Sequence, residues 1–394
     1  MRIAYFSDNF YPEISGISDS IITTGTELAS RGHEVCFISP YYPARDYKAS
    51  RDKTRDALTI KRIPSIPLPN SPTGQSRIAI PIGESLGFLR RFKPDVLHTQ
   101  SPYGTGLEAL IAKKFLKVPL IGTNHTPLEE FIQYAPGGRL YKGPALKYET
   151  WYYNHCSFVT APYQGLVDNM RTKGLTAPGR GVANPVPFPS SVKSDSQRTA
   201  CKMAFDIPGH MVLVSGRLAP EKHVDVVLRA FKKVLQQVPD ATLVITGNGS
   251  HEMLLKEEAR RLGIEERVRF AGFVKPQQLD DFYCTADVYT IMSTAETQSL
   301  SLMQAFATGV PAVSVRSRGL VDYTPPDAGF LVDVGDEDAL AARLTEILKD
   351  PELRERMGAA GAEFVKTLTP AKVADEWEKI YDDAILRAAS RSSS

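Results

Sequence analysis

The stretch MVLVSGRLAPEKHVDVVLRAF, residues 211–231, contains the pattern that decides the fold. It begins with a short apolar run, crosses a glycine and several polar residues, and continues with apolar residues at helical spacing. The same order recurs at residues 241–263, 268–286 and 287–309, and earlier at residues 2–30 and 95–117. Buried strands that alternate with amphipathic helices indicate parallel sheets with helices on both faces. The sequence therefore predicts an α/β fold.

The length of 394 residues exceeds what one ordinary hydrophobic core holds, so we expect two domains. The segment ANPVPFPSSVKSDSQRT, residues 183–199, is rich in Pro and Ser and has no period. We predict an N-terminal Rossmann-like domain at 1–186, a linker at 187–199 and a second Rossmann-like domain at 200–369. Residues 370–389 are predicted to form a helix that returns to the N-terminal domain, and 390–394 a disordered tail. Two doubly wound domains that face each other would bind ligands at the carboxyl ends of their strands.

Composition narrows the class of protein. The N-terminus carries no signal-peptide pattern, and no run of 18 apolar residues predicts a membrane span. Four scattered cysteines favour a reducing, cytoplasmic location without disulfides. Residues 1–186 hold 22 Lys and Arg against 15 Asp and Glu, a net charge of +7, and the remainder carries 25 − 30 = −5. A basic first half is compatible with an anionic partner, although scattered solvated lysines explain it equally well.

Two loops that follow strands have the features of an anion site. Arg217 and Lys222 flank the start of a predicted helix, whose free amides and dipole attract a diphosphate. In the first domain, DNFYPEISGISDSI places Gly16 before a helix, where a ligand can approach the backbone closely. A solvated loop explains either segment taken alone. Their position at carboxyl ends of strands favours ligand binding.

A third segment, STAETQSLSLMQAFATGVPAVSV, residues 293–315, places Glu296 between an apolar strand and an apolar helix. Its carboxylate can accept hydrogen bonds from sugar hydroxyls, and the amides of Gln298, Ser299 and Leu300 can hold phosphate. Gln304 follows eight residues after Glu296, about two helical turns, so we expect it to point to the same pocket.

Other candidates need weighing against simpler explanations. His125, in GTNHTPLEEF, follows a strand, and a structural histidine is about as good an explanation as a catalytic one. YGTGLEA, residues 103–109, matches a dinucleotide fingerprint but is not at the first strand, and we interpret it as tight helix–strand packing. His98 and His155 lack zinc-ligand spacing with His125. Asp280 and Asp281 are interpreted as a solvated helix face.

Together these segments resemble retaining glycosyltransferases of family 4, which have the GT-B fold of two Rossmann-like domains. The resemblance covers most of the chain and is strongest between Val212 and Val315. The matching segments are FYPEISGIS (10–18), GTNHT (122–126), SGRLAPEKHVDVVLRAF (215–231), GNGSHE (247–252), FAGFVKPQQLDDFYCTADV (270–288) and STAETQSLSLMQAFATGVPAV (293–313).

The resemblance implies a role for each matching position. Arg217 and Lys222 would bind the donor's diphosphate and neutralise its charge as it leaves, with no metal or other cofactor required. Glu296 would hold hydroxyls of the donor sugar. The remaining roles are phosphate approach at Gly16, sugar contact near the reacting carbon at His125, sugar and phosphate contact at the amides of Gln298, Ser299 and Leu300, and nucleoside contact at Val274 and Gln304.

Three positions depart from the family pattern. Gln304 stands where the family has a second Glu that binds the ribose, and an amide oxygen still accepts from a hydroxyl, so weaker binding is expected. Ser299 replaces a glycine, and Ser15–Gly16 replaces a pair of glycines.

The expected reaction transfers a hexose from a nucleotide sugar, UDP-sugar favoured and GDP-mannose second, with retention of configuration. The motif style is closest to members that glycosylate diacylglycerol or phosphatidylinositol, so we expect a lipid acceptor and peripheral contact with an anionic membrane surface. GESLGFLRRFK, residues 83–93, is a candidate for that contact, although burial against the sheet is favoured. Nucleic acid is not an expected partner. The alternatives are a soluble acceptor, a nucleotide-sugar epimerase, and a non-catalytic binding module in which Gln304 marks decay.

Overall fold

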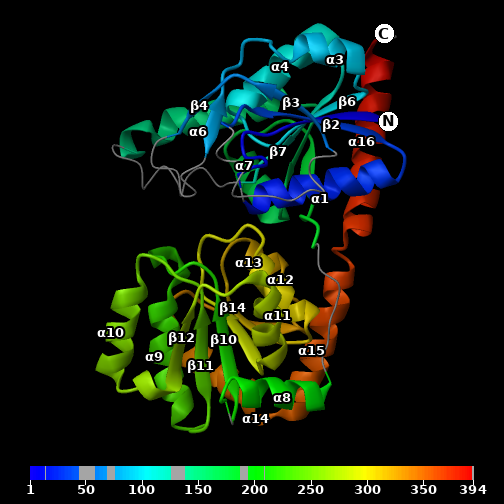
Figure 1. Cartoon of the computed structure of the whole chain (residues 1–394). Helices are drawn as coiled ribbons and strands as arrows, with labels where there is room; N and C mark the ends of the chain where they lie inside the picture. The colour runs from blue at the N-terminus through cyan, green and yellow to red at the C-terminus, as the bar shows by residue number, and fades with distance from the viewer. Residues whose placement is uncertain are drawn as a thin grey trace. The chain divides into compact units, whose positions relative to one another are not determined.

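The computed structural model describes residues 1–13, 15–43, 58–68, 76–125, 138–186, 194–207 and 209–392. The chain forms two compact units (Figure 1). Unit 1 comprises Met1–Pro185 and Pro370–Ser394, and unit 2 comprises Val186–Thr369. Each unit is built on its own parallel sheet, as the alternation of strand and helix predicts.

Unit 1 contains a seven-stranded sheet in the order β3-β2-β1-β6-β7-β8-β9, with every neighbouring pair parallel. Its strands are β1 (Arg2–Phe6), β2 (Glu34–Pro40), β3 (Thr59–Ile63), β6 (Val96–Thr99), β7 (Leu120–Thr123), β8 (Phe158–Ala161) and β9 (Gly179–Gly181). A separate antiparallel pair consists of β4 (Ser65–Pro67) and β5 (Arg77–Ala79). Its helices are α1 (Gly16–Ser30), α3 (Leu86–Phe92), α4 (Gly104–Leu116), α6 (Gly138–Asn154), α7 (Gln164–Thr172) and α16 (Pro370–Ser392).

The last helix, α16, belongs to unit 1 although it follows unit 2 in the chain (Figure 1). Its apolar residues recur every three or four positions, which forms one stripe on a helix. The stripe packs into the same core as β1 and α1, and its members are Val373, Ala374, Trp377, Ile380, Tyr381 and Ala384. The Tyr381 hydroxyl lies 2.8 Å from the Tyr5 hydroxyl and 2.7 Å from His98 Nδ1.

Unit 2 contains a six-stranded parallel sheet in the order β12-β11-β10-β13-β14-β15. Its strands are β10 (Met211–Ser215), β11 (Thr242–Thr246), β12 (Val268–Gly272), β13 (Val288–Ile291), β14 (Ala312–Val315) and β15 (Gly329–Val332). Its helices are α8 (Asp195–Ala204), α9 (Val224–Leu235), α10 (Glu252–Leu262), α11 (Pro276–Thr285), α12 (Leu300–Ala307), α13 (Gly319–Asp322), α14 (Glu337–Lys349) and α15 (Pro351–Lys366), with 3-10 turns η2 (Pro220–Lys222) and η3 (Glu265–Arg267). Figure 1 shows α9 and α10 on one side of this sheet and α11 and α12 on the other.

The order of the strands locates the site in each unit. The chain moves outward from β10 to β11 and β12, and then returns to the other side of β10 with β13. Loops diverge at such a switch point, which leaves room for a ligand at the carboxyl ends of the strands. Unit 1 has the same arrangement around β1, between β2 and β6.

The ends of the predicted segments differ from the structure in two places. Residues 195–199, expected to be linker, are helical because Ser194 and Gln197 form a capping box at the start of α8. The helix α16 continues to Ser392, past the expected start of the tail at residue 390. Residues 187–193 of the expected linker and 393–394 of the tail lie outside the described residues.

Two further predictions can be compared with the structure, one on helix packing and one on membrane spans. The interpretation of YGTGLEA as tight packing is confirmed, since a Cβ on Gly104 would lie 2.3 Å from the Ala79 carbonyl oxygen and one on Gly106 2.0 Å from that of Ser101. Among the helices that the structure describes, none has the length and apolar character needed to cross a membrane.

Candidate active site

In unit 2 the carboxyl ends of β10, β11 and β12 converge on three glycines with positive φ, namely Gly216 (147°), Gly247 (106°) and Gly272 (65°). A Cβ on Gly247 would lie 2.0 Å from the carbonyl oxygen of Gly216, so only glycine fits there. After Gly216 the chain first forms the turn η2, and the helix α9 begins only at Val224. Lys222 therefore ends a 3-10 turn instead of flanking the first residue of the long helix.

Each of the two predicted phosphate-binding cations has a carboxylate partner. Lys222 Nζ forms an ion pair with Glu296 Oε1, and the two side chains are only 24% and 15% exposed. Arg217 lies 2.8 Å from Glu221 Oε1, and its side chain is 61% exposed. Exposed ion pairs contribute little to stability, so Arg217 can leave Glu221 for a stronger anion at small cost. Lys222 and Glu296 form the shielded pair at the centre of this cluster.

The loop that carries Glu296 is fixed on two sides. The amide of Thr294 donates to the carbonyl of Glu221 at 3.0 Å, and the amide of Gly319 donates to the carbonyl of Glu296 at 3.2 Å. The loop ends at Ser299, whose Oγ accepts from the Leu302 amide at 3.3 Å and so caps α12. The loop is thereby held between η2 and α13, with Glu296 directed to Lys222.

The predicted amide site lies at the beginning of α12. Gln298 and Ser299 precede the helix, and Leu300 is its first residue. Amides at this end of a helix point along its axis, away from the helix body, and carry partial positive charge. Glu296 lies on the same short loop, so its carboxylate and the start of α12 are close in the chain.

The two predicted nucleoside contacts lie outside the loop that carries Glu296. Val274 is half-buried and follows β12. Gln304 is half-buried on α12, and its Nε2 donates to Asp280 Oδ1 of α11 at 2.5 Å. The amide nitrogen of Gln304 is thus engaged, while its carbonyl oxygen remains the atom that an incoming hydroxyl would use. Its assignment to the nucleoside stays a prediction.

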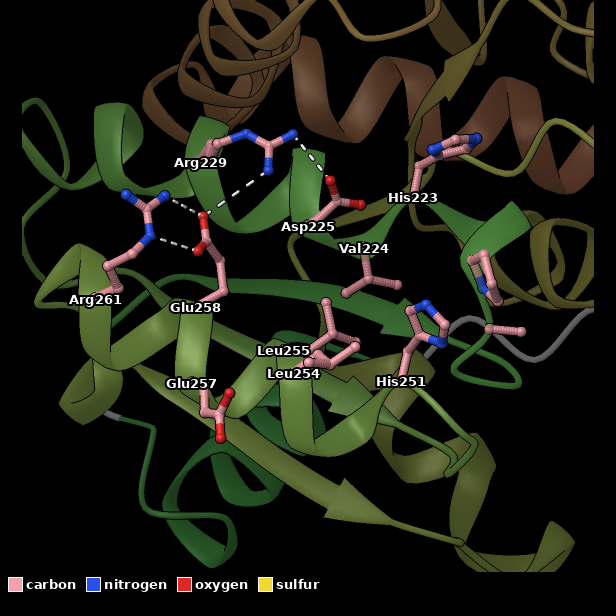
Figure 2. Close-up of a pocket in the computed structure, with 12 residues that line it drawn as sticks. His223, Val224, Asp225, Arg229, His251, Leu254, Leu255, Glu257, Glu258 and Arg261 are labelled. Carbon is pink, nitrogen blue, oxygen red and sulfur yellow. Dashed lines mark hydrogen bonds and ion pairs between the residues drawn. The ribbon is translucent and has the colours of Figure 1, made fainter.

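A groove of about 680 Å³ opens between α9 and α10, beside the turn η2 (Figure 2). Its apolar part is formed by Val224, Leu254 and Leu255, with His223 and His251 at the same end. Charged residues form the other end, where Nε and Nη2 of Arg261 each donate to a carboxylate oxygen of Glu258 at 2.7 Å. Neither Arg217 nor Glu296 lines this groove.

In unit 1 the predicted residues follow strands of the other sheet. Gly16 is the first residue of α1, and the Ser15 side chain caps that helix by accepting from the Ser18 amide. His125 follows β7 and is buried, with Nε2 2.6 Å from Gln100 Oε1. Burial lowers the pKa of His125 to about 4, so its imidazole is neutral at neutral pH. A neutral imidazole can accept a hydrogen bond from a sugar hydroxyl.

Sequence reasoning missed two partners of the predicted residues. Glu221 lies four residues after Arg217, the spacing of a helical ion pair, and that spacing is a usable signal. Gln100 follows β6 directly, and a polar side chain after a buried strand of a parallel sheet is a second signal. His98, by contrast, is buried between Tyr381 and Thr123 and belongs to the structural core.

The described residues provide no group of three or more His, Cys, Asp or Glu side chains arranged to hold a metal ion. Asp280, considered as one half of a metal-binding pair, instead accepts the hydrogen bond from Gln304.

Comparison with known proteins agrees with this arrangement. Residues 14–187 match the family described as Glycosyltransferase Family 4, and residues 203–364 match the Glycosyl transferases group 1 family. An alpha-monoglucosyldiacylglycerol synthase of Streptococcus pneumoniae is 27% identical over 90% of this chain and 80% of its own length. A GDP-mannose-dependent alpha-mannosyltransferase of Mycolicibacterium smegmatis is 28% identical over the full length of both chains.

Solved structures show the same fold. The crystal structure of HepE from Anabaena in complex with UDP has a TM-score of 0.78 over 97% of this chain and all of its own, at 16% identity. Sucrose-phosphate synthase of Thermosynechococcus elongatus has a TM-score of 0.74 over 98% of this chain and 99% of its own, at 18% identity. With two parallel α/β units and two consecutive family matches, the chain belongs to the family 4 glycosyltransferases of GT-B fold.

Proposed function

We propose that this glycosyltransferase transfers a hexose from a nucleotide sugar, UDP-hexose in the first place, to a membrane lipid such as diacylglycerol. The observation that carries the proposal is the cluster at the carboxyl ends of β10 and β13, where Lys222 and Glu296 pair beside Arg217 and the start of α12. Cations and a helix N-terminus suit a diphosphate, and a shielded carboxylate suits sugar hydroxyls.

On this proposal the donor rearranges the cluster. The diphosphate takes Arg217 from Glu221, since that exposed pair holds it weakly. Lys222 lies between the diphosphate and Glu296, so its charge is shared by the leaving group and by the carboxylate that orients the sugar. The amides at the beginning of α12 complete the contact. These positive groups are fixed before the reaction, and that preorganisation stabilises charge that develops on the leaving phosphate.

The reaction breaks the bond between the anomeric carbon and the phosphate oxygen and forms one between that carbon and the acceptor hydroxyl oxygen. The acceptor's proton passes to the leaving phosphate, and the nucleoside diphosphate departs. Attack from the face that the diphosphate leaves gives retention of configuration. Arg217 and Lys222 neutralise the leaving group, so the proposal requires no metal. His125, neutral and bonded to Gln100, accepts a hydrogen bond from the sugar.

The choice of acceptor rests on the relatives. Two alpha-monoglucosyldiacylglycerol synthases are similar to this chain. The net charge of +7 over residues 1–186 is consistent with peripheral contact with an anionic membrane. In GESLGFLRRFK, Leu89 is buried while Arg90 and Arg91 are exposed, so its basic residues rather than Leu89 would meet a lipid surface.

A soluble acceptor is the second candidate, and a specific observation favours it. An N-acetyl-alpha-D-glucosaminyl L-malate synthase and a D-inositol 3-phosphate glycosyltransferase are 26% identical to this chain over at least 95% of its length. GDP-mannose is the alternative donor, because two relatives that match at least 98% of this chain are GDP-mannose-dependent mannosyltransferases.

A thermal-shift panel of UDP-, GDP- and ADP-sugars, each with and without magnesium, tests the donor half. Selective binding at a hundredfold excess over Kd stabilises the native state by about 2.7 kcal/mol. We expect a clear shift with one nucleotide class, UDP-sugars first, that is insensitive to magnesium. A shift confined to GDP-mannose would identify GDP-mannose as the donor in place of UDP-hexose. The absence of any shift would contradict the proposal and favour the non-catalytic module.

A further inference from the structure

Three consecutive residues of unit 2 each hold the loop that carries Glu296. The carbonyl of Glu221 accepts from the Thr294 amide at 3.0 Å. Lys222 pairs with the carboxylate of Glu296. Nε2 of His223 lies 3.4 Å from Oγ1 of Thr294. Only the Lys222 contact involves a group with an expected substrate role, so the other two contacts act on the loop itself.

His223 adopts a backbone conformation that its side chain disfavours. Its φ and ψ are 47° and 42°, in the left-handed region, where it caps both the end of the turn η2 and the start of α9. Glycine adopts this conformation without strain, and most other residues do not. Figure 2 shows the imidazole at the rim of the groove between α9 and α10, away from the ion pairs at the other end. Strain of this kind persists where the side chain gains a contact that offsets it, and functional sites are common locations.

We propose that His223 is a positioning residue, which holds Thr294 and thereby fixes Glu296 against Lys222. The proposal rests on the donor role given above to Glu296. The proposal predicts that loss of the His223 contact affects the binding of two ligands differently. Binding of a nucleoside diphosphate depends on Arg217, Lys222 and the amides at the start of α12, which the Ser299 cap holds without a contribution from His223 or Thr294. Binding of the complete nucleotide sugar depends also on Glu296, and therefore on the loop.

The decisive variant is His223→Gly, which removes the contact with Thr294 and relieves the backbone strain. We expect a melting temperature equal to or above that of the wild type. Affinity for UDP changes by less than about twofold, while affinity for the UDP-sugar falls about tenfold, because displacement of a positioning group by a fraction of an ångström is enough to weaken the interaction. The matched control is Asp206→Gly. Asp206 is another non-glycine residue with positive φ (52°) in unit 2, and it does not contact this loop. Neither affinity should change in the control.

Thr294→Val removes the other partner of the contact with little change of shape. If the two side chains act through each other, Thr294→Val weakens sugar-donor binding as His223→Gly does, and the double variant is no weaker than either single one. If the losses of affinity caused by the two substitutions multiplied in the double variant, the proposal would be overturned. Equal loss of UDP and UDP-sugar binding would overturn it as well. If the wild type binds UDP-sugar and His223→Gly binds it equally well, this inference alone fails. If the wild type binds no nucleotide sugar of the panel, the proposed function fails as well.

Discussion

Lys222 and Glu296 lie 74 positions apart in the chain and meet where both side chains are largely shielded from solvent. Each needs the other, because a shielded charge without a partner is unfavourable. A bound donor sugar would share the carboxylate, and a bound diphosphate would share the ammonium group. On the proposed function, this pair would link the two halves of the donor, the part that stays on the acceptor and the part that leaves.

Glu296→Gln tests the carboxylate directly. The amide keeps the shape of the side chain but removes the charge that accepts hydrogen bonds from sugar hydroxyls. We expect kcat/KM to fall by about 10- to 100-fold, since a hydrogen bond to a charged group contributes about 1.5–3 kcal/mol. Steady-state transfer kinetics give the result. Glu252→Gln is the matched control, because Glu252 forms an ion pair with Lys256 on α10, away from the site. Unchanged kinetics in Glu296→Gln would exclude the role given to this residue.

The buried histidines of unit 1 make stability depend on pH. Burial lowers the pKa of His125 to about 4 and holds that of His98 well below its usual range. Below a pH of about 6.5 the unfolded chain binds protons that the folded chain excludes, so the free energy of unfolding falls as pH falls. At about pH 5.5 each histidine accounts for a loss of up to about 1.4 kcal/mol relative to pH 7.5.

Denaturant unfolding at these two pH values measures the effect. His125→Gln should remove its share of the pH dependence. A wild-type stability that is constant across this range would contradict the neutral state assigned to both buried imidazoles.

The last helix, α16, contacts residues that lie far from it in the sequence. Its Tyr381 hydroxyl joins Tyr5 of β1 to His98 of β6, and all three groups are buried. Tyr381→Phe leaves the other two groups short of a partner, which costs about 1–3 kcal/mol. Urea denaturation should show this loss, and Tyr41→Phe, at an exposed tyrosine, should show none. Equal stabilities in the two variants would mean that the network contributes nothing.

The short helix α13 also fixes the loop of Glu296, through the hydrogen bond from the Gly319 amide to the Glu296 carbonyl. A Cβ on Gly319 would lie 1.9 Å from the carbonyl oxygen of Thr297, so Gly319→Ala must displace that loop. We expect a stability loss of about 1–3 kcal/mol together with a lower kcat/KM. Gly87→Ala, where nothing lies within 4 Å of the new methyl group in α3, should instead leave activity unchanged. Full activity in Gly319→Ala would show that the loop's position is unimportant.

At the scale of the whole molecule, the sequence predicted both parallel sheets because buried strands and amphipathic helices have distinct periods. MVLVS forms β10, and VDVVLRAF forms the first part of α9, as expected. The spacing of apolar residues along the chain could not predict which distant side chains contact one another. The hydrogen bond from Gln304 to Asp280 depends on how α11 and α12 pack, which the helical period alone does not specify. The ion pair of Arg217 with Glu221 and the capping of α8 at Ser194 are local contacts. The spacing of these residues in the sequence is a usable signal for both contacts, although neither was predicted.

The central claim is transfer to a lipid, and one assay tests it directly. Wild-type protein is incubated with labelled UDP-hexose and diacylglycerol vesicles, and the lipid and aqueous phases are analysed for product, with Glu296→Gln in parallel. We predict a hexosyl-diacylglycerol that retains the anomeric configuration of the donor, formed far more slowly by the variant. Turnover of the donor without acceptor would instead indicate an epimerase, and product only in the aqueous phase on adding soluble acceptors would contradict the lipid assignment.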